Sequence, residues 1–109
     1  MGEAFNAASL EWQPIRPDVA HGVYGKSLLA DGIKLMLTRV EVGGKFDRHQ
    51  DNYEHLFFFL SGEGVVWVQD KWFKVVPGLT VRVTAGETHS YENTGNLDLV
   101  LISVNIPTH

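Results

Sequence analysis

Histidines and one aspartate occur at spacings that suit a metal site. His49, Asp51 and His55 lie within seven residues and share one parity, so an extended chain points their side chains to the same side. His89 follows 34 residues after His55, beyond the turn-like Ala85-Gly86. Three imidazoles and one carboxylate suit Fe, Mn, Co, Ni, Cu or Zn, and suit Ca or Mg poorly. These four residues predict one divalent transition-metal site.

Composition restricts the chemistry further. The 109 residues include no Cys, which excludes disulfides, thiolate zinc sites and cysteine nucleophiles. The net charge is -4 and the Lys and Arg residues are scattered, so no nucleic-acid partner is expected. The longest apolar run, Leu56 to Leu60, is far shorter than the roughly 20 residues that span a bilayer, and the N-terminal stretch does not resemble a signal peptide. We expect a cytoplasmic protein without a membrane partner.

Residues near the predicted ligands are candidates for the pocket. Tyr53 and Tyr91 carry hydroxyls that can donate to a substrate or act as acids, so they are the candidate catalytic residues. Phe57, Phe59 and Tyr91 are candidate substrate contacts, although inward aromatic residues more often belong to an ordinary core. Arg39 can pair with a substrate carboxylate if it faces inward, and is an ordinary solvated charge if it faces outward.

Other polar residues near the predicted site have different expected roles. Asp51 can bind the metal directly, reach it through water, or accept a hydrogen bond from an imidazole N–H. Glu54 has the opposite parity to the ligand positions, so it falls outside the site unless a bulge reverses its direction. His21 and His109 are expected at the surface or in the tail.

The elements that would position these residues are β-strands. Turn-like residues recur about every 8–12 positions, and no stretch keeps a helical period. This spacing predicts an all-β jelly roll, in which residues 1–20 form an extended N-terminal arm and residues 21–109 form a single barrel. The expected strands cover residues 22–29, 33–42, 53–61, 63–69, 72–76, 79–84, 88–92 and 97–106.

Both faces of the strand at residues 53–61 are apolar. One face carries Tyr53, His55, Phe57 and Phe59, and the other carries Glu54, Leu56, Phe58 and Leu60. A strand covered on one side alternates apolar with polar residues, so a second layer or a partner subunit is expected against this outer face. The pattern predicts a homodimer.

The sequence from Gly43 to Gly62 resembles the first cupin motif, with His49 and Asp51 in the His-x-His positions and His55 in place of the usual Glu. Fifteen residues later, a stretch from Gly78 to Asn93 resembles the second cupin motif, with His89 as its histidine and Thr84 where Pro is usual. The chain is similar to small manganese-binding cupins with four histidines, from which it departs at Asp51. The resemblance implies the cupin double-stranded β-helix.

The resemblance also implies a function. Mn or Fe is the favoured metal, with Ni, Co, Cu or Zn as alternatives, and the ion would act on a small oxygen-rich organic substrate in an oxygenase-like oxidation. A sugar-acid isomerase or lyase is the alternative enzyme. A metal-stabilised module that binds a small molecule without turnover is the alternative from another class. A protein-interaction domain is the weakest reading, because it leaves the shared parity of the ligands unexplained.

Overall fold

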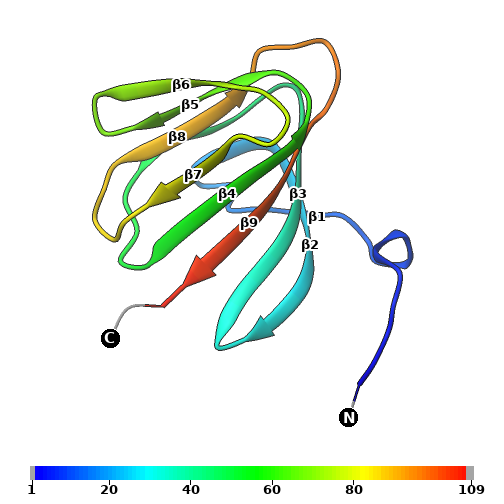
Figure 1. Ribbon diagram of the computed structural model, residues 1–109. Coiled ribbons are helices and arrows are strands. Elements are labelled where there is room, and N and C mark those ends of the chain that lie inside the picture. Colours follow the sequence, from blue (N-terminus) through cyan, green and yellow to red (C-terminus); the bar gives the residue numbers. More distant parts are fainter. Residues whose placement is uncertain (1, 108–109) are drawn as a thin grey trace.

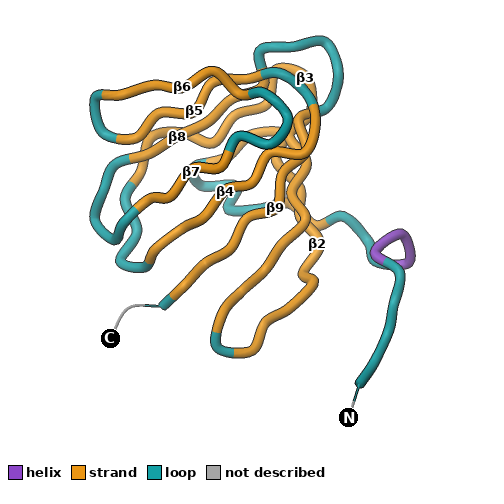
Figure 2. Tube along the Cα trace, in the orientation of Figure 1, coloured by secondary structure: helices purple, strands orange, loops and turns teal. Residues whose placement is uncertain are grey.

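The computed structural model describes residues 2–107, which form a sheet curled into a half-barrel (Figure 1). No α-helix occurs within this range, and a short 3-10 turn, η1 (Ala7–Ser9), precedes the sheet (Figure 2). None of its helical segments is long and apolar enough to cross a membrane. The strands are β1 (Gln13–Pro14), β2 (Ala20–Asp31), β3 (Ile33–His49), β4 (Glu54–Ser61), β5 (Gly64–Val68), β6 (Lys71–Val75), β7 (Thr80–Val83), β8 (His89–Asn93) and β9 (Leu99–Ile106).

The strands form one continuous sheet with two halves, which the long strand β3 joins. The sheet runs β6-β5-β8-β3-β9-β4-β7, with β2 against β3 and β1 against β2. The first part of β3, residues 34–40, pairs with β9, and its last part, residues 45–49, pairs with β8. All these pairings are antiparallel. The expected all-β cupin jelly roll is confirmed.

Two glycines let β3 pass from one sheet to the other. Gly43 has a φ of +79°, and a Cβ at Gly44 would lie 2.8 Å from the carbonyl oxygen of Gly22. The expectation that the strand ends at residue 42 is wrong, because the glycines bend β3 without ending it and it continues to His49. The other seven expected strands each have a counterpart, and the short β1 was not expected.

Alternating side chains of the two sheets form the core. Phe57 and Phe59 from β4 meet Tyr91 from β8, with ring centroids 5.3 Å apart for Phe57 and Tyr91 and 6.4 Å for Phe59 and Tyr91. Leu99 and Leu101 from β9 are also fully buried. Burial of each such side chain contributes about 1.5–3 kcal/mol to the free energy of unfolding. The packed interior holds the strand ends that carry the candidate site.

The outer face of β3, β9 and β4 is apolar and is only partly covered by residues 2–107. Cross-strand register places Leu35, Val104 and Leu56 in one row and Leu37, Ile102 and Phe58 in the next. We call these six residues the apolar stripe. Phe58 is 39% exposed, and the adjoining Leu60 is 41% exposed. The expected apolar outer face is therefore present.

Candidate metal centre

Three strand ends and one loop bring the predicted ligands together. His49 ends β3 and His89 begins β8, and the two are direct cross-strand partners. His55 lies near the start of β4, and Asp51 lies in the loop between β3 and β4. The His89 ring centroid is 4.2 Å from that of His49 and 4.6 Å from that of His55. Strand pairing therefore places all three imidazoles around one point.

One oxygen of Asp51 is the centre of this cluster. Its Oδ2 lies 2.8 Å from Nε2 of His55, 3.2 Å from Nε2 of His49 and 3.7 Å from Nε2 of His89. The donor atoms of His49, Asp51 and His89 all lie within 4.8 Å of one another. The Asp51 side chain is 8% exposed, so the cluster is largely withdrawn from water.

The other nitrogen of each imidazole faces a carbonyl-type oxygen. Nδ1 of His49 is 2.6 Å from the carbonyl oxygen of Asp47, and Nδ1 of His89 is 3.0 Å from that of Glu87. Nδ1 of His55 is 3.0 Å from Oδ1 of Asn105. Because backbone carbonyl oxygens only accept, Nδ1 of His49 and of His89 carries the proton and donates it, which leaves the Nε2 lone pair free, the form that binds a metal. His55 lies between two oxygens, because its Nε2 is also 2.8 Å from Oδ2 of Asp51, and its Nε2 would bind a metal when the proton is on Nδ1, toward Asn105.

The electrostatics also fit a cation. Burial lowers the pKa of His89 to about 4, so its imidazole is neutral at pH 7. Burial would raise the pKa of Asp51, but hydrogen bonds with His55 and Arg16 outweigh it and lower that pKa, so the carboxylate is charged. Nε2 of His89 is buried and has no hydrogen-bond partner among residues 2–107. Imidazole nitrogens and a carboxylate oxygen that converge at these distances form a donor set that could hold a divalent cation.

Arg16 is a site residue that the sequence did not reveal. Its Nη1 donates to Oδ1 of Asp51 at 2.8 Å, on the side of the carboxylate away from the imidazoles. Burial would lower the pKa of Arg16, but the Asp51 carboxylate outweighs it and raises that pKa. Arg16 follows β1 at a φ of +38°, a left-handed backbone conformation. No local pattern marks it, because the contact joins residues 35 positions apart.

The predicted aromatic residues lie at different depths. Tyr53, Phe57 and Tyr91 line the same cleft as the imidazoles, whereas Phe59 is fully buried deeper in the core and does not line the cleft. Burial raises the pKa of Tyr91, and burial together with the Asp51 charge raises the pKa of Tyr53. Both hydroxyls therefore keep their protons at neutral pH and can only donate or accept hydrogen bonds.

Arg39, the predicted substrate contact, is not among the residues that line the cleft. Its guanidinium carbon lies 5.0 Å from the ring centroid of Trp12 and 4.9 Å from that of Tyr24, and Nη1 is 3.6 Å from Asp98. Alternation along β3 explains this placement, because Lys34 and Met36, of the opposite parity, line the cleft.

The remaining polar residues lie outside the cluster. Glu54 accepts a hydrogen bond from Arg82 at 2.9 Å, on the outer face. The His21 side chain is 63% exposed and lies 3.4 Å from the Asp47 carboxylate. His109 lies outside the described residues.

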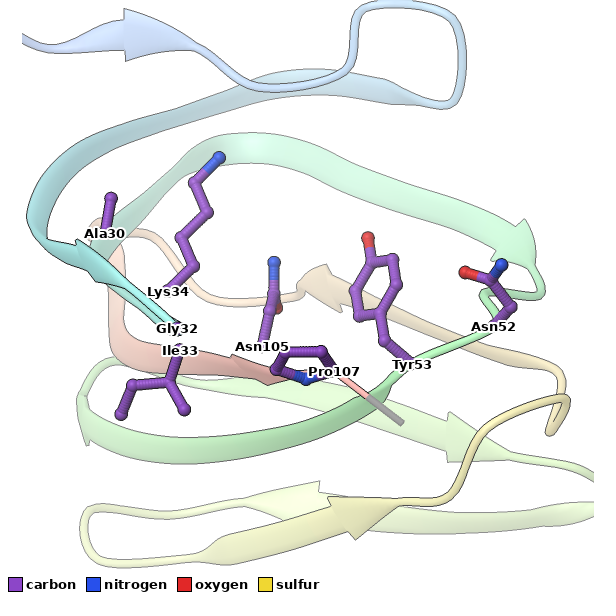
Figure 3. Close-up of a pocket in the computed structure, with 8 residues that line it drawn as sticks. All are labelled: Ala30, Gly32, Ile33, Lys34, Asn52, Tyr53, Asn105 and Pro107. Atoms are coloured by element: carbon purple, nitrogen blue, oxygen red, sulfur yellow. The ribbon is translucent and has the colours of Figure 1, made fainter. Parts of the chain in front are cut away.

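The cleft of the metal cluster is small and opens toward a wider mouth. Its volume is about 120 Å³, and the neighbouring mouth has about 560 Å³. Lys34, Tyr53 and Asn105 line both spaces, and their side chains point into the mouth (Figure 3). Of these three, Lys34 and Asn105 were not predicted, because their place depends on the pairing of β3 with β9.

Sequence comparisons identify relatives of this chain. The cupin domain family matches residues 36–105. An oxalate-binding protein of Thermotoga maritima is 37% identical over 57 residues, which cover 52% of this chain and 46% of that protein. An uncharacterized protein of Methanocaldococcus jannaschii is 28% identical over 96 residues, which cover 87% of this chain and 70% of that protein. The chain thus matches less than half the length of the oxalate-binding protein.

Solved structures share the fold. A predicted oxalate decarboxylase from Thermotoga maritima has a TM-score of 0.87 at 24% identity, covering 97% of this chain and 100% of that one. The polyketide cyclase RemF from Streptomyces resistomycificus has a TM-score of 0.86 at 20% identity, covering 96% of this chain and 79% of that one. KdgF from Halomonas sp. has a TM-score of 0.85 at 16% identity, covering 98% of this chain and 96% of that one. With a family match over most of its length and this fold, the chain belongs to the cupin family.

Proposed function

We propose that this cupin holds one divalent transition metal through His49, Asp51, His55 and His89, and that the metal anchors a small oxygen-rich organic acid. The observation that carries the proposal is the convergence of three Nε2 atoms on Oδ2 of Asp51. Mn or Fe is the proposed metal, with Ni, Co, Cu and Zn as alternatives that the same donor set accepts. Residues 1–20 serve as an arm of the single barrel in this proposal.

The chain's own residues have defined tasks in this proposal. The bound ion would supply Lewis acidity and, for Mn or Fe, one-electron chemistry with dioxygen. Arg16 holds the Asp51 carboxylate, and Asn105 holds His55, so both ligands keep their orientation. Phe57 exposes its apolar ring to the cleft and limits water there. Tyr53 keeps its proton, so its hydroxyl can donate to a substrate oxygen.

We place the reaction in the oxygenase-like class, with non-catalytic binding as the second candidate. The small inner cleft and the similarity to an oxalate-binding protein favour the binding role. An open mouth beside the metal favours an enzyme, because substrate and product can exchange there. Both candidates require the same metal anchor.

The proposed anchor is tested with oxalate. Protein stripped with chelator is reloaded with Mn or Zn, and oxalate binding is measured by titration calorimetry in the apo and loaded forms. Binding that requires the metal supports the proposal, whereas equal binding by both forms contradicts it. Oxygen consumption by the Mn-loaded and Fe-loaded protein with organic acids then separates an oxygenase from a binding module.

We also propose that the protein is a homodimer joined through the apolar stripe. Rows of Leu, Ile, Val and Phe on three adjacent strands give the kind of flat apolar surface that pairs with its own copy about a twofold axis. Phe58 and Leu60 are exposed on this face, and the other residues of the stripe are only half-buried by residues 2–107.

A further inference from the structure

The mouth of the barrel contains a lysine without a partner. Lys34 lines the mouth, and its ammonium group has neither an ion pair nor a hydrogen bond within residues 2–107. By contrast, Arg16 at the same end is already paired with Asp51 at 2.8 Å. A lysine ammonium offers three hydrogen-bond donors and a full positive charge. Lys34 is therefore available to bind an anion that enters the mouth.

Strand register connects Lys34 directly to the metal centre. Asn105 is the cross-strand partner of Lys34 on one side and of His55 on the other. The three side chains thus form a row across β3, β9 and β4, on the face that lines the cleft. Neighbouring strands lie about 4.8 Å apart, so the backbones of Lys34 and His55 are separated by about 10 Å. A small molecule can bridge this separation.

Asn105 and Tyr53 supply polar groups between the two ends of this row. Oδ1 of Asn105 accepts from His55, which leaves its amide N–H groups to donate elsewhere. Figure 3 shows the amide nitrogen of Asn105, the Tyr53 hydroxyl and the Lys34 ammonium turned toward the same space. An ammonium, an amide N–H and a hydroxyl that face one space are donors that suit an oxyanion, and the nearest site carboxylate, Asp51, is already paired with Arg16.

We propose that Lys34, assisted by Asn105 and Tyr53, binds the distal carboxylate of a small organic diacid whose other end is held at the metal centre. This inference rests on the proposed metal anchor and adds a substrate class to it. The inner cleft has about 120 Å³ and the mouth about 560 Å³. The chelating end of an acid would occupy the cleft, and the remainder of a longer acid would extend into the larger mouth toward Lys34.

The test compares three acids on the Mn-loaded protein. Oxalate binds the metal with both carboxylates and does not reach Lys34, whereas 2-oxoglutarate has a chelating end and a distal carboxylate. 2-Oxopentanoate has the same carbon chain without the distal carboxylate. We expect 2-oxoglutarate to bind about tenfold more tightly than 2-oxopentanoate, the scale of one charge-assisted hydrogen bond. Titration calorimetry gives all three dissociation constants.

Variants assign the preference to Lys34. Lys34→Met should abolish the tenfold preference and leave oxalate affinity and manganese content unchanged, and Lys34→Arg should restore most of the preference. Lys74→Met is the matched control, because it removes the same charge from an exposed position on β6. The Lys74→Met protein should keep the tenfold preference for 2-oxoglutarate over 2-oxopentanoate. Native mass spectrometry reports the bound manganese in each variant.

Each contrary result has one meaning. If wild-type protein binds oxalate but shows no preference between the two oxo acids, the diacid subsite is wrong and the metal anchor stands. A preference that survives in Lys34→Met also overturns the subsite. If none of the three acids binds the Mn-loaded protein, the proposed anchor fails, and the subsite fails with it.

Discussion

The two oxygens of Asp51 have separate partners. Oδ1 accepts from Arg16, while Oδ2 faces the three imidazoles. Arg16 thereby fixes the rotation of the carboxylate and leaves one oxygen available to a metal. Because the guanidinium also draws negative charge away from the ligand oxygen, this carboxylate is a weaker donor than an unpaired one. A position occupied by His in the four-histidine cupins thus carries an arginine-supported carboxylate here.

Substitution of Asp51 tests its part in metal binding. We expect Asp51→Ala to lower manganese affinity by roughly tenfold to a hundredfold, the scale of losing a support at a metal site. Asp51→His should lose less manganese affinity than Asp51→Ala, because an imidazole nitrogen can replace the carboxylate oxygen as a ligand. Glu54→Gln is the control, since that carboxylate pairs with Arg82 on the outer face. Wild-type manganese affinity in both Asp51 variants would show that Asp51 is not a ligand.

The buried imidazoles make stability of the apoprotein depend on pH. The pKa of His89 is about 4 in the folded protein, against about 6.5 in the unfolded chain, so between these values only the unfolded state takes up the proton. The free energy of unfolding should therefore fall as pH drops from about 6.5 to about 4. Urea unfolding of the metal-free protein measures this fall. His89→Gln should flatten it by up to about 1.4 kcal/mol per pH unit; an unchanged slope would contradict the assignment.

At the scale of the element, β3 decides the geometry of the site. Its first part carries Lys34 and its last residue is His49, so a single strand spans the mouth and the metal centre. The bend at Gly43 and Gly44 sets the angle between the two parts. The position of Lys34 relative to His49 therefore depends on two glycines that belong to neither the metal cluster nor the mouth.

Alanine substitutions distinguish the structural roles of Gly43 and Gly44. At Gly44 a Cβ would meet the carbonyl oxygens of Gly22 and Glu41 at 2.8 and 2.9 Å, so Gly44→Ala should cost about 2 kcal/mol of unfolding free energy and reduce manganese retention. Gly43→Ala has open space and bears only the strain of φ +79°, about 1 kcal/mol. Gly32→Ala, with the same φ in a hairpin turn, is the control. Equal melting temperatures for the Gly44 and Gly43 variants would contradict the close approach.

Local alternation explains what the sequence could predict. The parity of His49, Asp51 and His55 and the outward direction of Glu54 follow from a period of two within a short segment. Arg16 and Asn105 could not be inferred, because their contacts depend on backbone paths and strand register that join distant segments. The direction of Arg39 stayed open for a related reason, since its face depends on the register of the whole of β3.

At the scale of the whole molecule, the two faces of the sheet that contains β4 have opposite tasks. The inner face holds the metal cluster and the core, while the outer face carries the apolar stripe. A chain of 109 residues buries a limited part of its surface, so covering the stripe with a second copy adds stability. Lys34, Asn105 and His55 lie on β3, β9 and β4, and the proposed dimer contact would stabilise these three strands.

A charge in the stripe should separate the subunits. Phe58→Glu is expected to convert a dimer to a monomer and to lower the melting temperature, because the carboxylate would be buried without a partner in the interface. Phe73→Glu is a matched control, since Phe73 on β6 is 40% exposed and Phe58 is 39% exposed. Light scattering after gel filtration gives the mass. A dimeric Phe58→Glu variant would place the interface elsewhere.

The sheet begins and ends on strands with a free edge, β6 and β7. These edges carry Lys71, Lys74 and Arg82, and such cations oppose the strand-by-strand addition that leads to fibrils. Association through the edges would be open-ended, whereas association through an apolar face is complete after two copies. The distribution of cations and apolar residues over the sheet would thus favour the proposed dimer over open-ended association.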